Sequence, residues 1–335
     1  MDSTTNTIVI DAMGGDYAPD ETIKGAVQAL SSIERLNISL VGIEKEIRQV
    51  LDSFNFPADS IEIINAPQKI GMGESPSEVI RKKKDSSIYK GTLIASQTKN
   101  SAFLSAGNTG AVMACSLFNL KRIENVLRPA IATVIPLAGK SLVLIDSGAN
   151  ADCKPKYLHQ FAIMGKVYAE NILGIANPKI GLVNVGEEEK KGNELSVKSY
   201  QLLKQTRLNF VGNVEGREIF EGTVDIAVCD GFVGNVLLKA IEGLANLLFG
   251  QVKETLSSSF YNKLLALGLK KSFKEMKKKF DYEEYGGAHL LGVNGVPIIS
   301  HGSSRAKAIY NAVRVANEGI NSNLVKKIRE EIITN

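Results

Sequence analysis

Short apolar runs rich in β-branched residues recur along the chain, most of them followed by a glycine-rich turn and then by helical periodicity. Apolar runs of this length are typical of buried strands, and glycine, asparagine and aspartate mark the turns that follow them. The pattern predicts strands at residues 7–11, 38–42, 102–106, 141–146, 179–186, 224–230 and 296–300. Strands that alternate with helices favour a mostly parallel sheet covered by helices, which is an α/β fold.

Two helix starts are marked by proline. Ser75-Pro76-Ser77-Glu78 has the form of a capping box with proline at the first helical position. Lys154-Pro155 precedes an apolar-periodic stretch at residues 157–172, and Asn177-Pro178 follows its expected end. The sequence contains no fixed-period repeat and no low-complexity linker, so we expect residues 1–335 to form a single α/β unit of one or two lobes.

Residues 251–280 depart from this alternation. Two sets of apolar residues at helical spacing are separated by Gly268, and seven lysines between Lys263 and Lys279 are opposed by Glu275 alone. The pattern predicts a basic amphipathic helical hairpin that protrudes from the α/β unit.

Composition narrows the class of protein. The net charge of +4 over 335 residues is a mild excess that does not by itself indicate nucleic-acid binding. The three cysteines lie far apart, which argues against a disulfide framework or a zinc site and suits a reducing cytoplasm. The N-terminus lacks a basic segment before an apolar run, and no stretch approaches the ~20 apolar residues of a membrane-spanning helix. We therefore expect a cytoplasmic protein that lies at most on a membrane surface.

The glycine-rich loops suggest anion binding. A backbone without Cβ atoms can approach an oxyanion closely, and helix N-termini offer free N–H groups to it. No loop fits a P-loop motif or the dinucleotide fingerprint, so a nucleotide is not indicated. The alternative for each loop is a tight turn, and for Asp11, Asp16, Asp146 and Asp230 it is capping of that turn. The candidate phosphate- or substrate-binding residues are Asp11, Gly14, Gly15, Asn108, Thr109, Asn150, Lys190, Asn193, Asp230, His301 and Ser303.

Some side chains in these loops could also carry chemistry. Lys190 and Lys191, directly after a strand, could hold an anion or polarise a carbonyl group, although charged loops are normally solvated surface. Asn235 either caps the helix that follows it or donates its amide to a developing oxyanion. His301 could act as a general base, whereas Cys153 lacks an identifiable partner for a nucleophilic role. No residue spacing fixes a metal site.

Six blocks of the chain, in order, resemble the PlsX family, the phosphate acyltransferases of bacterial phospholipid synthesis. The blocks are IDAMGGDYAPDETIKGA, SAGNTGAVM, NVGEEEKKGNEL, CDGFVGNVLLK, YGGAHLLG and HGSS. The resemblance implies a fold similar to isocitrate dehydrogenase and phosphotransacetylase, a homodimer, and no metal or organic cofactor. It also implies transfer of a long acyl chain from acyl carrier protein to inorganic phosphate. The acyl phosphate formed would feed a glycerol-3-phosphate acyltransferase in the membrane.

The resemblance also assigns roles to two residues. By motif position, Lys191 and Asn235 are the expected catalytic residues, with Lys191 binding phosphate or neutralising charge and Asn235 donating to the oxyanion. Because the product is an acylated anion, the basic hairpin is expected to contact an anionic membrane at the inner face of the cell membrane. Its alternative roles are dimer packing and docking of the acidic carrier protein. The expected contact residues are Phe260, Leu264, Leu267, Lys270 and Lys271.

Other functions remain open from the sequence. A phosphotransacetylase-like enzyme that uses coenzyme A would share the architecture, and a decarboxylating dehydrogenase of the same fold is disfavoured only weakly by the missing dinucleotide fingerprint. A non-catalytic scaffold at the membrane surface would share the basic hairpin.

Overall fold

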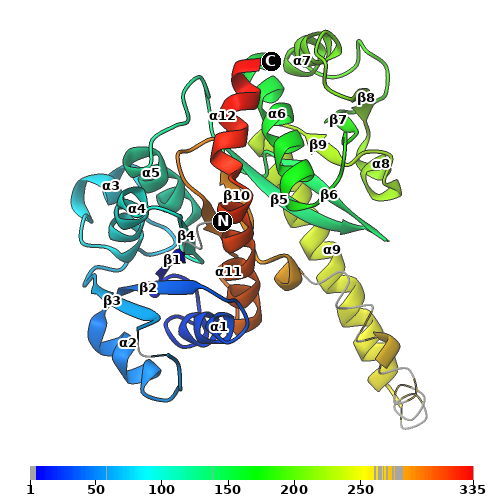
Figure 1. Cartoon of the computed structure of the whole chain (residues 1–335). Coiled ribbons are helices and arrows are strands. Elements are labelled where there is room, and N and C mark those ends of the chain that lie inside the picture. Colours follow the sequence, from blue (N-terminus) through cyan, green and yellow to red (C-terminus); the bar gives the residue numbers. More distant parts are fainter. Residues whose placement is uncertain are drawn as a thin grey trace.

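Eleven described strands form one continuous sheet. The computed structural model describes residues 5–57, 59–137, 139–259, 262, 266, 268, 271–273, 275 and 282–334. The strand order across the sheet is β3-β2-β1-β4-β11-β10-β5-β6-β9-β7-β8 (Figure 1). The strands are β1 (Asn6–Asp11), β2 (Leu36–Gly42), β3 (Ile61–Asn65), β4 (Ser101–Ser105), β5 (Ala130–Leu137), β6 (Lys140–Ile145), β7 (Ile180–Val183), β8 (Phe210–Val214), β9 (Ile226–Val228), β10 (Ala288–Leu291) and β11 (Pro297–Ile299).

The sheet consists of two parallel arrays that run in opposite directions. Strands β3, β2, β1, β4 and β11 are parallel to one another, as are β6, β9, β7 and β8. Between the arrays, β10 is antiparallel to both β11 and β5, and β5 is antiparallel to β6. These three reversals place the carboxyl ends of the two arrays at opposite edges of the sheet.

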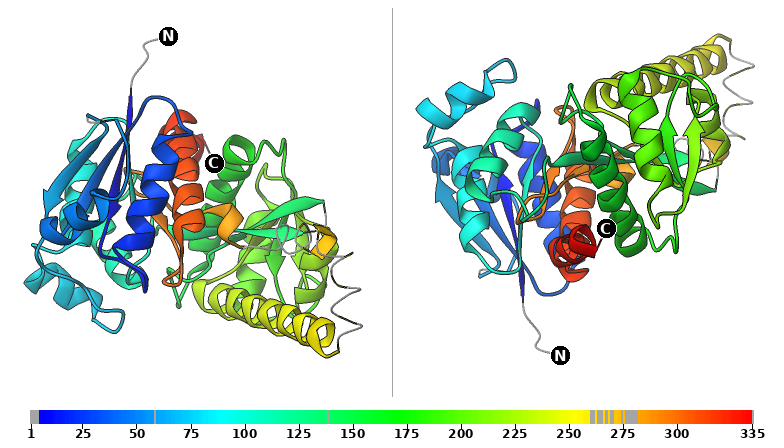
Figure 2. Two further views of the ribbon diagram at one scale, coloured as in Figure 1. Left: turned by 90° about the horizontal axis from the view of Figure 1, so that it is seen from below. Right: turned by 90° about the horizontal axis from the view of Figure 1, so that it is seen from above.

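Helices cover both faces of the sheet (Figures 1 and 2). On one face α1, α2 and α11 cover the first array, while α6, α7 and α12 cover the second. On the other face lie α3, α4 and α5 over the first array, and α8 and α9 over the second. The helices are α1 (Asp20–Leu30), α2 (Glu44–Leu51), α3 (Pro76–Lys82), α4 (Ser87–Gln97), α5 (Thr109–Asn119), α6 (Pro155–Ile172), α7 (Glu194–Lys204), α8 (Gly216–Glu221), α9 (Gly231–Ser257), α11 (Ala306–Asn321) and α12 (Leu324–Thr334), with a 3-10 turn η1 at Tyr282–Tyr285.

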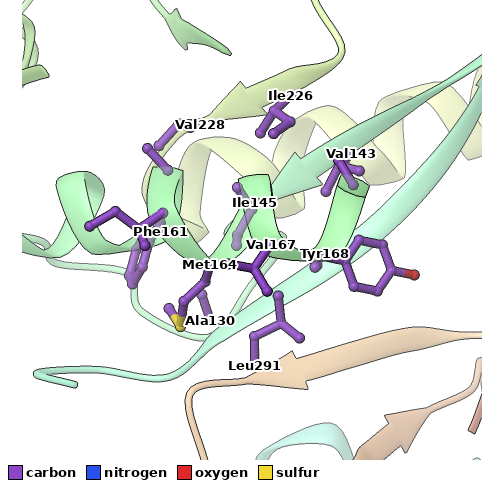
Figure 3. Packing of buried hydrophobic residues seen from close by; sticks show 14 of the residues in the cluster. Ala130, Val143, Ile145, Phe161, Met164, Val167, Tyr168, Ile226, Val228 and Leu291 are labelled. Atoms are coloured by element: carbon purple, nitrogen blue, oxygen red, sulfur yellow. The ribbon is translucent and has the colours of Figure 1, made fainter. Parts of the chain in front are cut away.

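Helix α6 packs against one face of the second array. Figure 3 shows Phe161, Met164 and other apolar side chains of α6 packed over β5, β6, β9 and β10. The sheet residues in this cluster include Ile145 and Val228, the last residues of β6 and β9, and both are fully buried. Burial of each large apolar side chain stabilises the fold by about 1.5–3 kcal/mol. Core packing therefore fixes the ends of β6 and β9, from which the next loops begin.

The predicted mostly parallel sheet is confirmed, and each of the seven predicted strands is present. Helix α6 also begins at Pro155 and ends at Ile172 as predicted. The pattern missed β3, β5, β8 and β10, and with β5 and β10 it missed the reversal of direction. The capping box at Ser75 does not form, because the Ser75 hydroxyl contacts that of Ser77 at 3.0 Å and makes no capping hydrogen bond.

Helix α9 corrects the predicted start of the protruding segment. The helix that contains Gln251 begins at Gly231 and runs without interruption to Ser257, so residue 251 does not start a new element. Apolar side chains are exposed along it from its first turn, including Phe232, Val236 and Leu244. Of the described helices, α9 alone has the length and composition that crossing a bilayer would require, which the apolar-run criterion had missed. The predicted contact residues Phe260, Leu264, Leu267 and Lys270 lie outside the described residues, and Lys271 is exposed.

Candidate functional site

The candidate residues fall into two groups at opposite edges of the sheet. Asp11 is the last residue of β1, Asn108 and His301 follow β4 and β11, and all three belong to the first array. Asn150, Asp230 and the loop of Lys190 and Lys191 follow β6, β9 and β7 and belong to the second. In a sheet whose strands all ran in one direction these loops would share one edge, but the reversal of strand direction separates them.

Asp11 organises the first group from inside. Its buried carboxylate accepts hydrogen bonds from the Ser105 hydroxyl (2.7 Å), the Met13 N–H (3.1 Å), the Gly14 N–H and the Ser87 hydroxyl. Burial raises the pKa of Asp11, and these hydrogen bonds oppose the rise. A Cβ at Gly14 would lie 2.4 Å from the Asp11 Oδ2, so this glycine leaves room for the carboxylate. Gly15, at φ +101°, lies against the Gly302 carbonyl. The glycines of this loop serve the turn.

Asn108 is committed to structure as well. Its Oδ1 accepts from the Ala111 N–H (2.9 Å) and caps α5, and its amide nitrogen donates to the carbonyls of Gly71, Met72 and Glu74. A side chain with every polar atom engaged has little left for a substrate. The adjacent Thr109 is exposed at the first turn of α5.

His301 and Ser303 form a local pair after β11. The exposed His301 ring accepts a hydrogen bond at Nδ1 from the Ser303 N–H (3.2 Å), and the same atom lies 2.7 Å from the Ser303 hydroxyl. Because Nδ1 accepts from a backbone N–H, the neutral ring carries its proton on Nε2. The register places this histidine at the opposite edge from Lys191 and Asn235, so it does not join them in one site.

Asp146 organises the second group. Its carboxylate is fully buried and accepts from the N–H groups of Ile131, Gly148, Ala149 and Asn150, and from the Asn150 amide. Burial raises the pKa of Asp146, and these hydrogen bonds oppose the rise. The Asn150 amide also donates to the Pro129 carbonyl at 2.8 Å. The polar groups of this loop therefore point into the fold, and Asn150 is a structural residue.

Asp230 and Asn235 lie in the first two turns of α9. Asp230 caps the helix by accepting from the Val233 N–H at 2.8 Å, so the alternative in which Asn235 is the cap is wrong. Within the part of the chain that the structure describes, the half-buried Asn235 amide makes no hydrogen bond. A Cβ at Gly148 would lie 3.6 Å from the Cβ and Cγ of Asn235, which places the Asn235 side chain beside the 147–150 loop.

The lysine loop has a fixed backbone and open side chains. The Asn184 amide donates to the Lys191 carbonyl at 3.0 Å, and Asn193 caps α7 by accepting from the Ser196 N–H at 2.9 Å. Lys190 is exposed, and the Lys191 side chain is 56% exposed with its Nζ 3.9 Å from Glu188. The pairing of Leu182 with Val228 brings this loop and the start of α9 to the same edge. Sequence reasoning missed Asn184, although its place directly after a strand was a usable signal.

The remaining candidates for chemistry are poorly suited to it. Burial raises the pKa of the Cys153 thiol to about 12, which argues against a nucleophilic thiolate. His159 lies in α6, as the sequence indicated, and burial lowers its pKa. His289 is fully buried, and burial lowers its pKa to about 3. The described residues contain no cluster of three or more histidine, cysteine or carboxylate side chains placed to hold a metal ion.

Solved structures similar to this chain include two phosphotransacetylases. The chain is similar to a phosphotransacetylase from Streptococcus pyogenes, with a TM-score of 0.60, 16% identity and coverage of 95% of this chain and 94% of that one. It is similar also to the EutD phosphotransacetylase from Staphylococcus aureus, with a TM-score of 0.59, 14% identity and coverage of 94% of each chain. These likenesses confirm the predicted phosphotransacetylase-like fold.

Sequence relatives establish the family. The family described as fatty acid synthesis protein matches residues 6–327. A phosphate acyltransferase from Halothermothrix orenii is 53% identical over 327 residues, with 97% of this chain and 98% of the relative covered. Another from Pelotomaculum thermopropionicum is 52% identical over 325 residues, with 97% and 94% covered. The chain therefore belongs to the phosphate acyltransferase family of lipid-synthesis enzymes.

Proposed function

We propose that the chain transfers a long-chain acyl group from acyl carrier protein to inorganic phosphate, forming an acyl phosphate for phospholipid synthesis. The observation that carries the proposal is the location of the exposed lysine loop and of the Asn235 amide at the same sheet edge. Lys190 and Lys191 follow β7, and Asn235 follows the adjacent parallel strand β9. Family membership and the phosphotransacetylase-like fold support the same reaction class.

In the proposed reaction a phosphate oxygen attacks the thioester carbonyl, so a carbon–oxygen bond forms and a tetrahedral oxyanion develops. Collapse of that intermediate breaks the carbon–sulfur bond and releases the carrier thiolate, which then takes a proton. Lys191, with Lys190 beside it, binds phosphate and offsets its charge, and the Asn235 amide donates to the oxyanion. Phosphate is the nucleophile, so the enzyme needs no nucleophilic side chain and Cys153 has no role.

The test is phosphate-dependent release of carrier thiol from long-chain acyl carrier protein. Lys191→Ala and Asn235→Ala are each expected to lower kcat by about 10²–10³, the usual cost of losing one oxyanion donor or its charged counterpart. Lys198→Ala is the matched control, because Lys198 pairs with Glu194 on the surface of α7. If both folded variants kept near-normal acyl phosphate formation, the assignment of these residues would be wrong.

Two rival functions have distinct outcomes in the same assay. Preference for acyl-coenzyme A over acyl carrier protein would favour a phosphotransacetylase-like enzyme. Lack of turnover with every acyl donor would favour a non-catalytic scaffold at the membrane surface. Phosphate-dependent turnover with acyl carrier protein supports the proposal over both.

The exposed apolar face of α9 supports a peripheral position at the inner face of the cell membrane. Leu244, Leu247 and Leu248 are each more than half exposed, and the basic segment at residues 263–279 follows in the chain. Lysines near an anionic surface contribute about 1 kcal/mol each to membrane binding. The acyl phosphate would then be released where a membrane acyltransferase can use it. A homodimer that packs this face, and docking of the carrier protein on the lysines, are the alternatives.

Flotation with liposomes separates these occupants. Leu244→Glu combined with Leu247→Glu should abolish flotation with anionic liposomes, and so should Leu264→Glu combined with Leu267→Glu. Leu93→Glu is the control, since Leu93 is a partly exposed leucine on α4. Unchanged flotation of both double variants would remove the membrane proposal. A shift from dimer to monomer by light scattering, without any effect on flotation, would assign the face to a second copy.

A further inference from the structure

Resting on the proposed function, we infer that Asp146 is a positioning residue for Asn235. Asp146 is the first residue after β6, and Asn235 lies on α9 after the neighbouring strand β9. The two residues are connected through the 147–150 loop, which Asp146 folds and which lies against Asn235. Asp146 is fully buried and does not itself face a substrate.

The first connection is between the Asp146 carboxylate and the loop. Oδ1 accepts from the N–H groups of Ile131 (3.1 Å), Gly148 (3.2 Å) and Ala149 (2.8 Å). Oδ2 accepts from both the N–H and the side-chain amide of Asn150 at 2.8 Å. Five donors from a four-residue loop and its neighbouring strand converge on one carboxylate, so the loop has a single backbone conformation.

The second connection is between this loop and the start of α9. The Asn150 carbonyl accepts from the Gly231 N–H at 2.7 Å, and Gly231 is the first residue of the helix. A Cβ at Gly234 would lie 2.0 Å from the Asp146 carbonyl oxygen, so the helix packs directly on the backbone of Asp146. Asp146 therefore contacts α9 through its backbone and holds it through the loop.

The third connection places Asn235 itself. Gly148 has φ +144°, a conformation that L side chains rarely adopt, and a Cβ added there would lie 3.6 Å from the Cβ and Cγ of Asn235, so the Asn235 side chain faces Gly148 across the space of one methyl group. The N–H groups of Gly148, Ala149 and Asn150 are all bound to Asp146, and that of Ser147 is bound to the Ile131 carbonyl. The loop thus offers no N–H from residues 147–150 to an anion. Its role is to support the neighbouring amide.

A carboxylate is required at this position by the number of donors. An asparagine at 146 would keep one accepting oxygen and turn an amide group toward the remaining N–H donors, leaving them without acceptors. The loop would shift, and Asn235 would lose the surface beside it. A displacement of about 1 Å at a positioned group can cost about 10²-fold in rate. Asp146→Asn is therefore expected to lower kcat about 10²-fold and to change either KM by less than about threefold.

The decisive measurement is a double-mutant cycle on kcat. If Asp146 acts through Asn235, Asp146→Asn should cost less than about threefold in the Asn235→Ala background, since the group it positions is already gone. Its effect on the free energy of unfolding should be the same in both backgrounds. Asp225→Asn is the control, because Asp225 accepts the Lys179 N–H (2.8 Å) at the opposite end of β9. Multiplicative losses in kcat would overturn the inference.

A readout that needs no turnover separates this inference from the proposed function. The side-chain amide resonances of Asn235 in ¹⁵N-asparagine-labelled protein should shift and broaden in Asp146→Asn and remain unchanged in Asp225→Asn. Unchanged Asn235 resonances in folded Asp146→Asn would overturn the positioning role even if acyl transfer is confirmed. Shifted resonances in a chain that turns over no acyl donor would keep the coupling and reject the acyl transfer.

Discussion

The two sheet edges have the same construction and different outcomes. Each has a buried aspartate at a strand end, Asp11 as the last residue of β1 and Asp146 directly after β6, and each carboxylate binds N–H groups of its own glycine-rich loop. At the first edge the neighbouring amide of Asn108 is fully used by the fold. At the second edge, within the residues that the structure describes, the Asn235 amide makes no hydrogen bond, Lys190 is exposed, and the half-exposed Lys191 ammonium makes a long ion pair with Glu188 at 3.9 Å.

The difference shows where anion chemistry can reside in such loops. In both loops the glycines leave room for a carboxylate or a helix to approach closely. Backbone N–H groups of the two loops donate to Asp11 and to Asp146. Loop composition alone therefore does not distinguish a binding edge from a structural one. What distinguishes them is the set of side chains that the local fold does not consume.

The largest expected effect tests how tightly the second edge is packed. Gly234→Ala places a methyl group 2.0 Å from the Asp146 carbonyl oxygen, so we expect a loss of about 3 kcal/mol or more in the free energy of unfolding. Gly243→Ala on the same helix meets open space and should gain up to about 1 kcal/mol from helix propensity. Urea unfolding measures both. A Gly234→Ala variant as stable as Gly243→Ala would contradict the packing of α9 on Asp146.

The next effect concerns the strand between the two arrays. His289 on β10 packs edge-on against Tyr168, with 4.9 Å between the ring centroids. Neither nitrogen of the His289 ring has a hydrogen-bond partner among the described residues. Burial lowers the pKa of His289 to about 3 from 6.5. Between these values the unfolded chain binds a proton that the native chain does not, so stability falls as the pH is lowered.

At pH 4.5 this linkage should cost wild type about 2.5 kcal/mol relative to pH 7, from ~1.4 kcal/mol per pH unit. His289→Phe should remove that share of the pH dependence, which urea unfolding at the two pH values would measure. If the free energy of unfolding changed equally with pH in wild type and variant, His289 would not be buried as a neutral ring. Separate transitions for the two halves would show that the arrays do not share one cooperative core.

The smallest expected effect contrasts the two asparagines directly. Asn108→Ala removes the cap of α5 and three donated hydrogen bonds, so we expect a loss of about 1–2 kcal/mol in stability. Asn235→Ala should change stability by less than about 0.5 kcal/mol while it lowers kcat. Thermal unfolding measures the effect of each substitution on stability, and the phosphate-dependent assay measures its effect on kcat. A large loss of kcat in folded Asn108→Ala, with normal stability, would show that the first edge is part of the active site.

Local sequence predicts the strands that glycine loops follow and only part of the change in their direction. Residues 7–11, 102–106 and 141–146 are recognisable because an apolar run meets a turn. Two of the three reversals join neighbours in the chain, β5 to β6 and β10 to β11, across short connections that contain Gly139 and Asn294-Gly295, so a hairpin signal was present and the strand prediction missed it. The third reversal pairs β10 with β5, which lies far away in sequence, and no local pattern reports that pairing.

The site residues divide in the same way. The helix-cap role of Asp230 and the strand-end position of Asp146 follow from their place before a turn or helix. The commitment of Asn108 depends on carbonyls 34 to 37 residues earlier in the chain, which sequence spacing does not bring into view. The alternative in which Asn235 is a helix cap fails because α9 begins at Gly231, four residues before Asn235.

Helix α9 connects the second sheet edge to a distant surface of the protein. At 1.5 Å per residue its 27 residues extend about 40 Å, and Asn235 lies near the end that is clamped to the sheet. Leu244, Leu247 and Leu248 are exposed farther along the same helix. Because α9 runs unbroken from Gly231 to Ser257, no loop separates these leucines from Asn235. A surface that covered the leucines would therefore be connected to the Asn235 position through one continuous helix.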